Sequence, residues 1–159
     1  DHNVMQDDQE QQKTTPNEIN DGDEKADLIA RAMHKRDTVA QNLDVVIEEA
    51  RVGYTRVRMQ VTDYMLNGHG TVHGGYSFIL ADIAFGYACN SHGQMAFAQS
   101  AQITYLSFGR PGEILTAVAE ERSQTNRTGI FDATVFGDDG RVVAEFRGMS
   151  RTVKGQVAV

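Results

Sequence analysis

Asp82 is the residue with the clearest chemical potential in this sequence, because it is the only charged side chain in the apolar run at 76–89. A run that is apolar on every side is the pattern of a helix buried in a core, where a carboxylate is disfavoured unless it is paired or hydrogen-bonded. Gly74 and Gly75 precede the run and leave free backbone N–H groups at the helix N-terminus, where developing negative charge is stabilised. The pattern therefore predicts a carboxylate and an oxyanion donor on one helix.

The spacing of Gly74 and Asp82 carries a second inference. The two residues are eight positions apart, which separates them by roughly 12 Å along a helix axis. One reacting carbonyl cannot contact both, because each group must lie within hydrogen-bond reach of it. If both act on one substrate, Asp82 must come from a second chain whose helix runs antiparallel to the first. We therefore expect a two-fold dimer with two composite sites.

The elements that must position these residues follow from the remaining pattern. Apolar positions before Arg36 predict a short amphipathic helix, and two runs rich in β-branched residues predict a hairpin. A glycine-rich loop leads into the helix at 76–89. The expected strands lie at 43–50, 54–61, 96–108, 113–123, 129–136 and 142–152. Two strands, one long helix and four strands predict an α+β domain in which the sheet wraps the helix.

Composition divides the chain into an acidic tail and a neutral body. Residues 1–23 lack apolar periodicity and are expected to be disordered, with a single domain over 24–159. Residues 1–27 hold nine acidic and two basic side chains and so carry the whole net charge of −7. The neutral body argues against nucleic acid as the main partner. No stretch has the apolar length of a membrane span and the N-terminus does not resemble a signal peptide, so we expect a cytoplasmic protein that does not bind membranes.

Four segments together resemble a known family. They are NGHGTVHGG at 67–75, LAD at 80–82, AFGYACNS at 84–91 and EFRGMSRTV at 145–153. In order and spacing they are similar to the hotdog-fold thioesterases, and most to the phenylacetate-degradation type, which hydrolyses hydroxyphenylacetyl-CoA and related thioesters. The resemblance covers about residues 30–153. It implies the hotdog fold, an antiparallel sheet wrapped around a long central helix, and hydrolysis of aryl- or medium-sized acyl-CoA to free acid and CoA.

The resemblance also implies a role for each of five residues. Gly74 supplies the N–H that polarises the thioester carbonyl, and Asp82 is the nucleophile or the general base. Asn67 matches a side chain that orients the substrate carbonyl or the attacking water. Ser100 matches a hydroxyl that helps to hold the water or the carboxylate, and His73 matches the histidine before the oxyanion glycine. For His73 we favour an imidazole that braces the loop by hydrogen bonding over one that transfers protons.

Several residues bear on cofactors and partners. Arg110, Arg127, Thr128 and Gly129 lie in expected turns and are candidates to meet the phosphates of coenzyme A. Coenzyme A would be part of the substrate, and we expect no cofactor. We expect no metal, because His69 and His73 share a loop rather than a helix face. The partners expected are the acyl-CoA substrate and a second copy of the chain, with edge strands favouring pairing of dimers into tetramers.

Two other functions fit the same fold. A hydratase or dehydratase would need an acid–base pair across the site, for which His73 and Asp82 are available. A noncatalytic acyl-CoA-binding regulator would need no carboxylate in an apolar helix. The order and spacing of the residues favour the thioesterase over the first function, and the presence of Asp82 favours it over the second.

Overall fold

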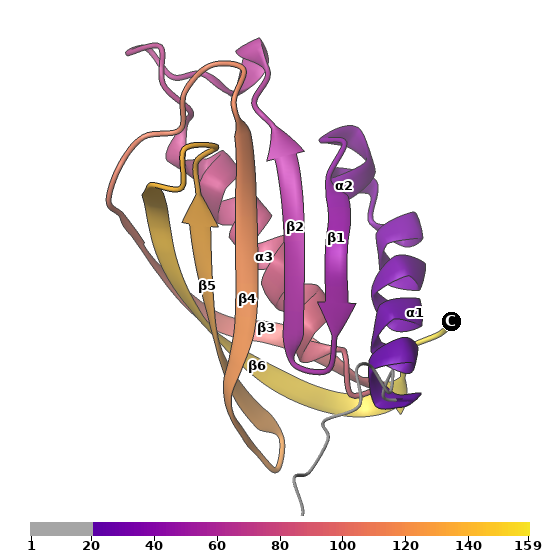
Figure 1. Cartoon of the computed structure of the whole chain (residues 1–159). Coiled ribbons are helices and arrows are strands. Elements are labelled where there is room, and N and C mark those ends of the chain that lie inside the picture. The colour runs from indigo at the N-terminus through magenta and orange to yellow at the C-terminus, as the bar shows by residue number, and fades with distance from the viewer. Residues whose placement is uncertain (1–20) are drawn as a thin grey trace, which may run out of the picture.

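A six-stranded antiparallel sheet curves around one long helix (Figure 1). The computed structural model describes residues 21–159, so residues 1–20 of the expected tail lie outside it. The strand order is β1-β2-β4-β5-β6-β3. The strands are β1 (Val46–Arg51), β2 (Tyr54–Gln60), β3 (Gln94–Tyr105), β4 (Ile114–Thr125), β5 (Thr128–Phe136) and β6 (Val142–Gln156). The α+β arrangement predicted from the sequence is confirmed.

The central helix, α3 (Gly74–Cys89), packs against β2, β4 and β5. Its residues Leu80, Ala84 and Phe85 are fully buried. Because the helix is enclosed by the concave side of the sheet, apolar residues are needed around most of its circumference, as the sequence pattern indicated. Asp82 sits in the middle of this helix and is half-buried.

Alternation along the strands builds the core between the sheet and α3. The Phe85 ring meets Phe131 of β5 and Phe146 of β6, with ring centroids 5.6 and 5.7 Å apart. Gly148 of β6 faces the same ring, and a Cβ atom there would lie 2.8 Å from it. The glycine therefore permits the close approach of α3 to the sheet.

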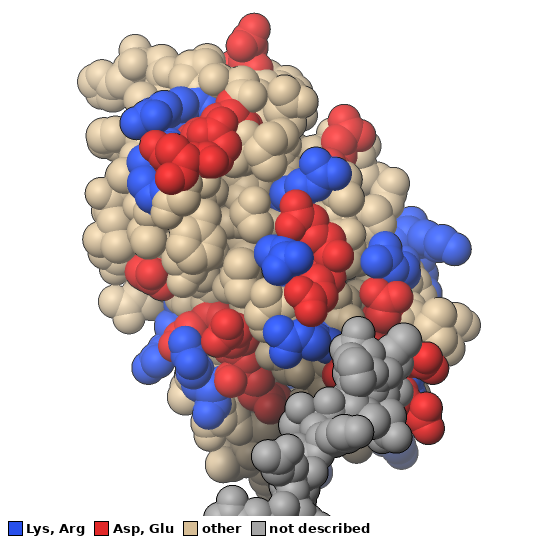
Figure 2. All heavy atoms as spheres, viewed as in Figure 1, with Lys and Arg blue, Asp and Glu red and all other residues tan. Residues whose placement is uncertain are grey.

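The outer face of the sheet is polar, with charges of both signs beside one another (Figure 2). Arg56 and Arg58 of β2 pair with Glu48 of β1 at 2.8 and 3.3 Å. Across β4, β5 and β6, Asp132 accepts hydrogen bonds from Arg122 at 2.9 Å and Arg147 at 2.6 Å. Exposed pairs of this kind stabilise a fold only weakly. Their mixed signs leave no single-sign stripe on the face that Figure 2 shows.

Two helices precede the sheet and lie beside β1: α1 (Asp21–Arg36) and the one-turn α2 (Thr38–Asn42). The expected tail of residues 1–23 is therefore too long by three residues, because the helix begins at Asp21. The reason is a contact distant in sequence, since the Asp23 carboxylate accepts the Val52 N–H at 2.9 Å. A short 3-10 helix, η1 (Asp63–Met65), begins the loop before α3.

Strand β3 forms one edge of the sheet, and within the described residues it pairs only with β6. Most of its side chains are exposed, Phe97 at 57% and Tyr105 at 49% among them. Leu106 and Phe108, just beyond it, are also exposed. A long, apolar, unpaired edge is a template for pairing with another strand. No helix in the described part of the chain is long and apolar enough to cross a membrane.

Candidate active site

Asp82 lines a largely apolar cavity of about 570 Å³, here named the Asp82 cavity. Its walls are the C-terminal half of α3, the start of β3, the α1–α2 junction and the chain segment after β6. Lining side chains include Met33, Asp37, Phe85, Tyr87, Met95 and Phe97. Burial raises the pKa of Asp82, and the Asp37 carboxylate raises it further. A carboxylate with raised proton affinity at an apolar cavity is suited to accept a proton from water or to attack a carbonyl.

Gly74 lines a second, smaller cavity of about 330 Å³, here named the Gly74 pocket. The pocket lies at the N-terminus of α3, against the segment that follows β3. The N–H groups of Gly74 and Gly75 have no hydrogen-bond partner among the described residues. Free donors at a helix N-terminus can stabilise a developing oxyanion. No residue lines both cavities, so the structure of one chain keeps Gly74 and Asp82 in separate sites.

Asn67 lines the Gly74 pocket and also holds the loop before α3. Its side-chain oxygen accepts the N–H groups of His69 at 2.9 Å and Thr71 at 3.2 Å. Its amide nitrogen donates to the Thr71 hydroxyl at 2.9 Å. That nitrogen carries a second N–H, for which no described residue provides an acceptor. The arrangement thus combines a turn residue with a donor at the wall of the pocket.

His73 is the N-cap of α3, and its side chain is exposed. Its backbone N–H donates to the Met65 carbonyl at 2.8 Å. The expected bracing by the imidazole is not found, because the ring makes no hydrogen bond with any described residue. The backbone, rather than the imidazole, fixes the loop. The His73 side chain lines the Gly74 pocket.

Tyr105, at the end of β3, lines the Gly74 pocket, and no pattern in the sequence indicated it. Its hydroxyl donates to the Gly74 carbonyl at 3.1 Å, and a Cβ atom on Gly74 would lie 2.8 Å from the Tyr105 ring. A side chain at position 74 would therefore have to displace the end of the Tyr105 side chain. The contact joins residues 31 positions apart, and no local signal predicts it.

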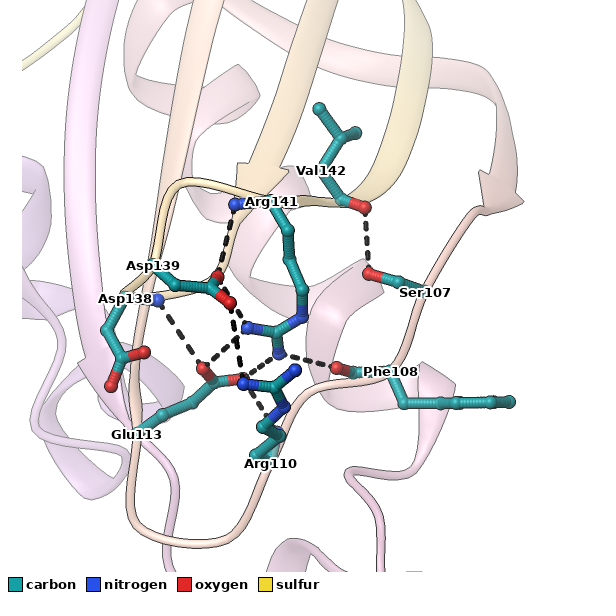
Figure 3. A network of polar contacts seen from close by, with 8 residues as sticks. All are labelled: Ser107, Phe108, Arg110, Glu113, Asp138, Asp139, Arg141 and Val142. Atoms are coloured by element: carbon teal, nitrogen blue, oxygen red, sulfur yellow. Dashed lines mark hydrogen bonds and ion pairs between the residues drawn. The ribbon is translucent and has the colours of Figure 1, made fainter.

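A buried ion pair of Glu113 and Arg141, here named the clamp, holds the wall of the Gly74 pocket opposite α3 (Figure 3). Glu113 is 5% exposed, and its carboxylate accepts two charged hydrogen bonds from the Arg141 guanidinium. Arg141 also donates to the Phe108 carbonyl at 2.6 Å. On the other side of the same segment, Gly109 accepts the Val72 N–H at 2.9 Å. The clamp therefore fixes the segment that carries Phe108 and Gly109, both of which line the pocket.

Ser100 lies in the middle of β3, apart from both cavities. It pairs with Met149 of β6, next to the pair of Ala101 with Gly148. Because Gly148 faces Phe85 of α3 and neighbouring residues of a strand face opposite sides, Ser100 points to the outer face. The structure thus does not bring Ser100 to Asp82 within one chain.

The four candidates for phosphate binding lie in two separate places. Arg110 follows Gly109 at the Gly74 pocket, and its exposed guanidinium pairs with Asp139 at 3.4 Å. Arg127 lies in the turn between β4 and β5, at the other end of β4, roughly 40 Å away along the strand. Thr128 is half-buried beside it. Gly129 is buried, and a Cβ atom there would lie 2.6 Å from the Ser150 hydroxyl, so packing explains this glycine.

Cys89 offers no competing nucleophile, and the described residues offer no metal site. Burial raises the pKa of the Cys89 thiol to about 12, and Asp82 contributes further. The thiol therefore stays protonated at neutral pH, as expected for a packed side chain. Within residues 21–159, no cluster of His, Cys, Asp or Glu is arranged to hold a metal ion.

The fold and the two cavities define a class of protein: a hotdog-fold domain with a carboxylate on its central helix and, at the N-terminus of that helix, backbone donors that no described residue occupies. Residues 69–144 match the thioesterase superfamily. The chain belongs to that superfamily, and it is a thioester hydrolase.

Individual relatives agree with this assignment. The chain is 42% identical to the acyl-coenzyme A thioesterase PaaI of Escherichia coli, over 80% of this chain and 91% of the relative. The structure of the E. coli PaaI protein from the phenylacetic acid degradation operon superposes with a TM-score of 0.84, at 41% identity, over 86% of this chain and 99% of that one. A hypothetical thioesterase of Streptococcus pneumoniae with coenzyme A superposes with a TM-score of 0.68, at 30% identity, over 72% and 91%.

Proposed function

We propose that this protein hydrolyses acyl-CoA thioesters that carry aryl or medium-sized acyl groups, of the phenylacetyl or hydroxyphenylacetyl type, to the free acid and CoA. The observation that carries the proposal is Asp82, a half-buried carboxylate of raised pKa at an apolar cavity large enough for such an acyl group. The likeness to the PaaI thioesterase and to a relative bound to coenzyme A supports it. We propose a cytoplasmic location, as expected from the sequence.

We also propose that each site combines Gly74 of one subunit with Asp82 of another. The start of β3 lines the Asp82 cavity, and Tyr105 at its end lines the Gly74 pocket. If two exposed β3 edges pair antiparallel about a two-fold axis, the start of one strand meets the end of the other. The Asp82 cavity of each subunit then adjoins the Gly74 pocket of the other. Ser100, in the middle of β3, lies near that axis. Pairing of such dimers into tetramers remains part of the proposal.

In the proposed reaction, the thioester carbonyl oxygen accepts the Gly74 N–H, which stabilises negative charge on that oxygen. Either Asp82 takes a proton from water, which attacks the carbonyl carbon, or the Asp82 carboxylate attacks it and water then cleaves the mixed anhydride. In both routes the C–S bond breaks and the sulfur leaves as the CoA thiolate. Thiolate is a good leaving group, so no strong general acid is required. We propose that the side-chain N–H of Asn67 for which no described residue provides an acceptor orients the substrate carbonyl or the water.

For the CoA phosphates we propose Arg110, at the rim of the Gly74 pocket, and Arg127 with Thr128 of the opposite subunit. Strand register places the start of β5 near the Asp82 cavity. Thr128 of β5 pairs with Arg151 of β6, and Arg151 pairs with Phe97 of β3, which lines that cavity. Antiparallel β3 pairing would therefore bring Arg127 of one subunit toward the side where Arg110 of the other lies. Guanidinium groups suit phosphate oxygens in charge and in geometry.

The function is tested by incubating the purified protein with a panel of aryl- and straight-chain acyl-CoAs and measuring release of free thiol. Enoyl-CoA substrates in the same panel test for hydration. We expect thiol release, fastest with aryl-acetyl groups. A folded protein that releases no thiol from any member of the panel would contradict the proposed function.

The composite site is tested by subunit mixing. Gly74→Pro removes the donor at the first helical position, where the proline backbone is tolerated. Its ring must displace the end of the Tyr105 side chain, so circular dichroism checks that the fold is kept. Asp82→Ala removes the carboxylate. A mixed dimer of the two single variants should regain one intact site. The matched control mixes wild-type subunits with the Gly74→Pro/Asp82→Ala double variant, whose mixed dimers should have no intact site. If each site instead lay within one chain, mixed dimers of the two single variants would have no intact site. Mixed dimers of wild type and double variant would then keep one.

A further inference from the structure

A second carboxylate, Asp37, faces the cavity that contains Asp82. Asp37 is the N-cap of α2, and its Oδ1 accepts the Ala40 N–H at 3.0 Å. Its Oδ2 accepts the Tyr87 hydroxyl at 2.9 Å. Tyr87 is 3% exposed and lies five residues after Asp82 on α3. Two elements distant in sequence thus hold this carboxylate in one place, and each of its oxygens accepts a hydrogen bond.

The other charged groups of the cavity do not neutralise the two carboxylates. Within the described residues, the remaining titratable or charged lining groups are Arg36, Tyr87 and Cys89. The guanidinium of Arg36 donates to the Ala158 carbonyl at 2.9 Å, and no ion pair joins it to Asp37 or Asp82. Strand β3 and the segment after β6 line the cavity with uncharged side chains only. Asp82 itself has no hydrogen bond or ion pair with any described residue.

We propose that Asp37 is a positioning residue for thioester hydrolysis, which acts on Asp82 by holding a negative charge at the wall of the shared cavity. Tyr87 and the first turn of α2 determine where that charge lies. A like charge in a cavity of low polarity disfavours ionisation of its neighbour, and the direction of the Asp82 pKa agrees with this. A carboxylate that binds its proton more strongly is a better general base near neutral pH. The inference rests on the proposed function, in which Asp82 is the reacting carboxylate.

The test uses neutral replacements that keep the helix cap. Asparagine and serine are both good N-cap residues, so Asp37→Asn and Asp37→Ser should remove the charge and preserve α2. In both variants we expect the acidic limb of the pH profile of kcat/KM to move to lower pH. The plateau of kcat should fall by less than about tenfold, well short of the effect expected for loss of Asp82 itself. Asp37→Glu, which restores the charge, should return the limb toward its wild-type position.

The matched control is Tyr87→Phe, which removes the hydroxyl and keeps the Asp37 charge. We expect it to lower the melting temperature and to move the acidic limb less than Asp37→Asn does, because the charge remains and the Ala40 N–H still holds it. A merely structural role for Asp37 predicts that all these variants change stability alone. A wild-type limb in folded Asp37→Asn and Asp37→Ser would overturn the proposal.

A readout without substrate separates this inference from the proposed function. The titration of Asp82 can be followed by carbon-13 NMR of labelled aspartate, with Asp82→Asn identifying the signal. We expect the midpoint to be lower in Asp37→Asn than in the wild type. A lower midpoint supports the inference even if no tested thioester is hydrolysed. Absence of hydrolysis counts against the proposed function alone. An unchanged midpoint overturns the inference whatever the activity.

Discussion

At the scale of single residues, the surroundings of Asp82 disfavour its charged form and increase its affinity for a proton. Its carboxylate is half-buried at an apolar cavity without a hydrogen-bond donor among the described residues. Burial and Asp37 raise its pKa, so the charged form is disfavoured in the folded chain. The same environment increases its affinity for a proton, which is useful in a general base.

The first prediction concerns the contribution of Asp82 to activity. Asp82→Ala should lower kcat/KM for an acyl-CoA by at least about a hundredfold, the lower range for a positioned acid or base. Circular dichroism and gel filtration should show that the variant keeps its fold and its oligomeric state. Near-normal turnover by a folded variant would falsify a catalytic role for Asp82.

The second prediction concerns stability and its dependence on pH. The pKa of Asp82 is raised in the fold, so the folded state holds its proton to higher pH than the unfolded state, and stability falls as pH rises between the two pKa values. Asp82→Asn should therefore raise the melting temperature at neutral pH. The gain should vanish below the unfolded pKa of about 4. Thermal unfolding across this range measures it, and an equal gain at all pH values would exclude ionisation as the cause.

At the scale of elements, the clamp of Glu113 and Arg141 joins the β3–β4 connection to the β5–β6 turn (Figure 3). Burial disfavours the charge of Glu113, but hydrogen bonds from Arg141 and from two backbone N–H groups lower its pKa. The stability that this carboxylate contributes is present above its unfolded pKa and is lost as pH falls through the lower, folded value. Its effect on stability thus has the opposite sign to that of Asp82.

The third prediction concerns this clamp. Glu113→Ala should destabilise the fold by about 3 kcal/mol, because it leaves Arg141 without its buried partner. It should also raise KM more than it lowers kcat, since Phe108 and Gly109 line the Gly74 pocket. Arg110→Ala is the control for stability alone: within the fold its guanidinium makes an exposed pair with Asp139, and loss of such a pair should change stability little. Equal losses of stability in the two variants would contradict the clamp.

The elements show what local patterns can and cannot predict. Helices α1 and α3 and the six strands of the described residues were predicted, because periodicity and turn residues are local signals. The helix α2 was missed, since it is one turn long and depends on the cap by Asp37. Asp82 and Gly74 were recognised from their own segments. Tyr105, Asp37 and Glu113 were not, because the hydrogen bonds that place each of them join residues distant in sequence.

At the scale of the whole molecule, charge is divided unevenly. Residues 1–20 hold five acidic side chains and one basic side chain, whereas Figure 2 shows charges of both signs intermingled on one face of the body. Coenzyme A is an anion, so a net negative segment would oppose its approach over distances of about a Debye length, which is roughly 10 Å at 0.1 M salt. The domain itself begins no later than Asp21, where α1 starts.

The fourth prediction compares two changes on either side of the boundary between residues 1–20 and helix α1. Deletion of residues 1–20 should leave kcat and the melting temperature nearly unchanged, because their composition predicts few native contacts. It should lower KM for acyl-CoA at low salt, and the difference should disappear above about 0.15 M salt as the charges are screened.

Asp23→Ala, only three residues beyond the deletion, should instead lower stability by about 1 kcal/mol, since it removes the acceptor of the Val52 N–H. Thermal unfolding and steady-state kinetics at two salt concentrations measure these effects. A large loss of stability or turnover on deletion of residues 1–20 would show that this segment contacts the body.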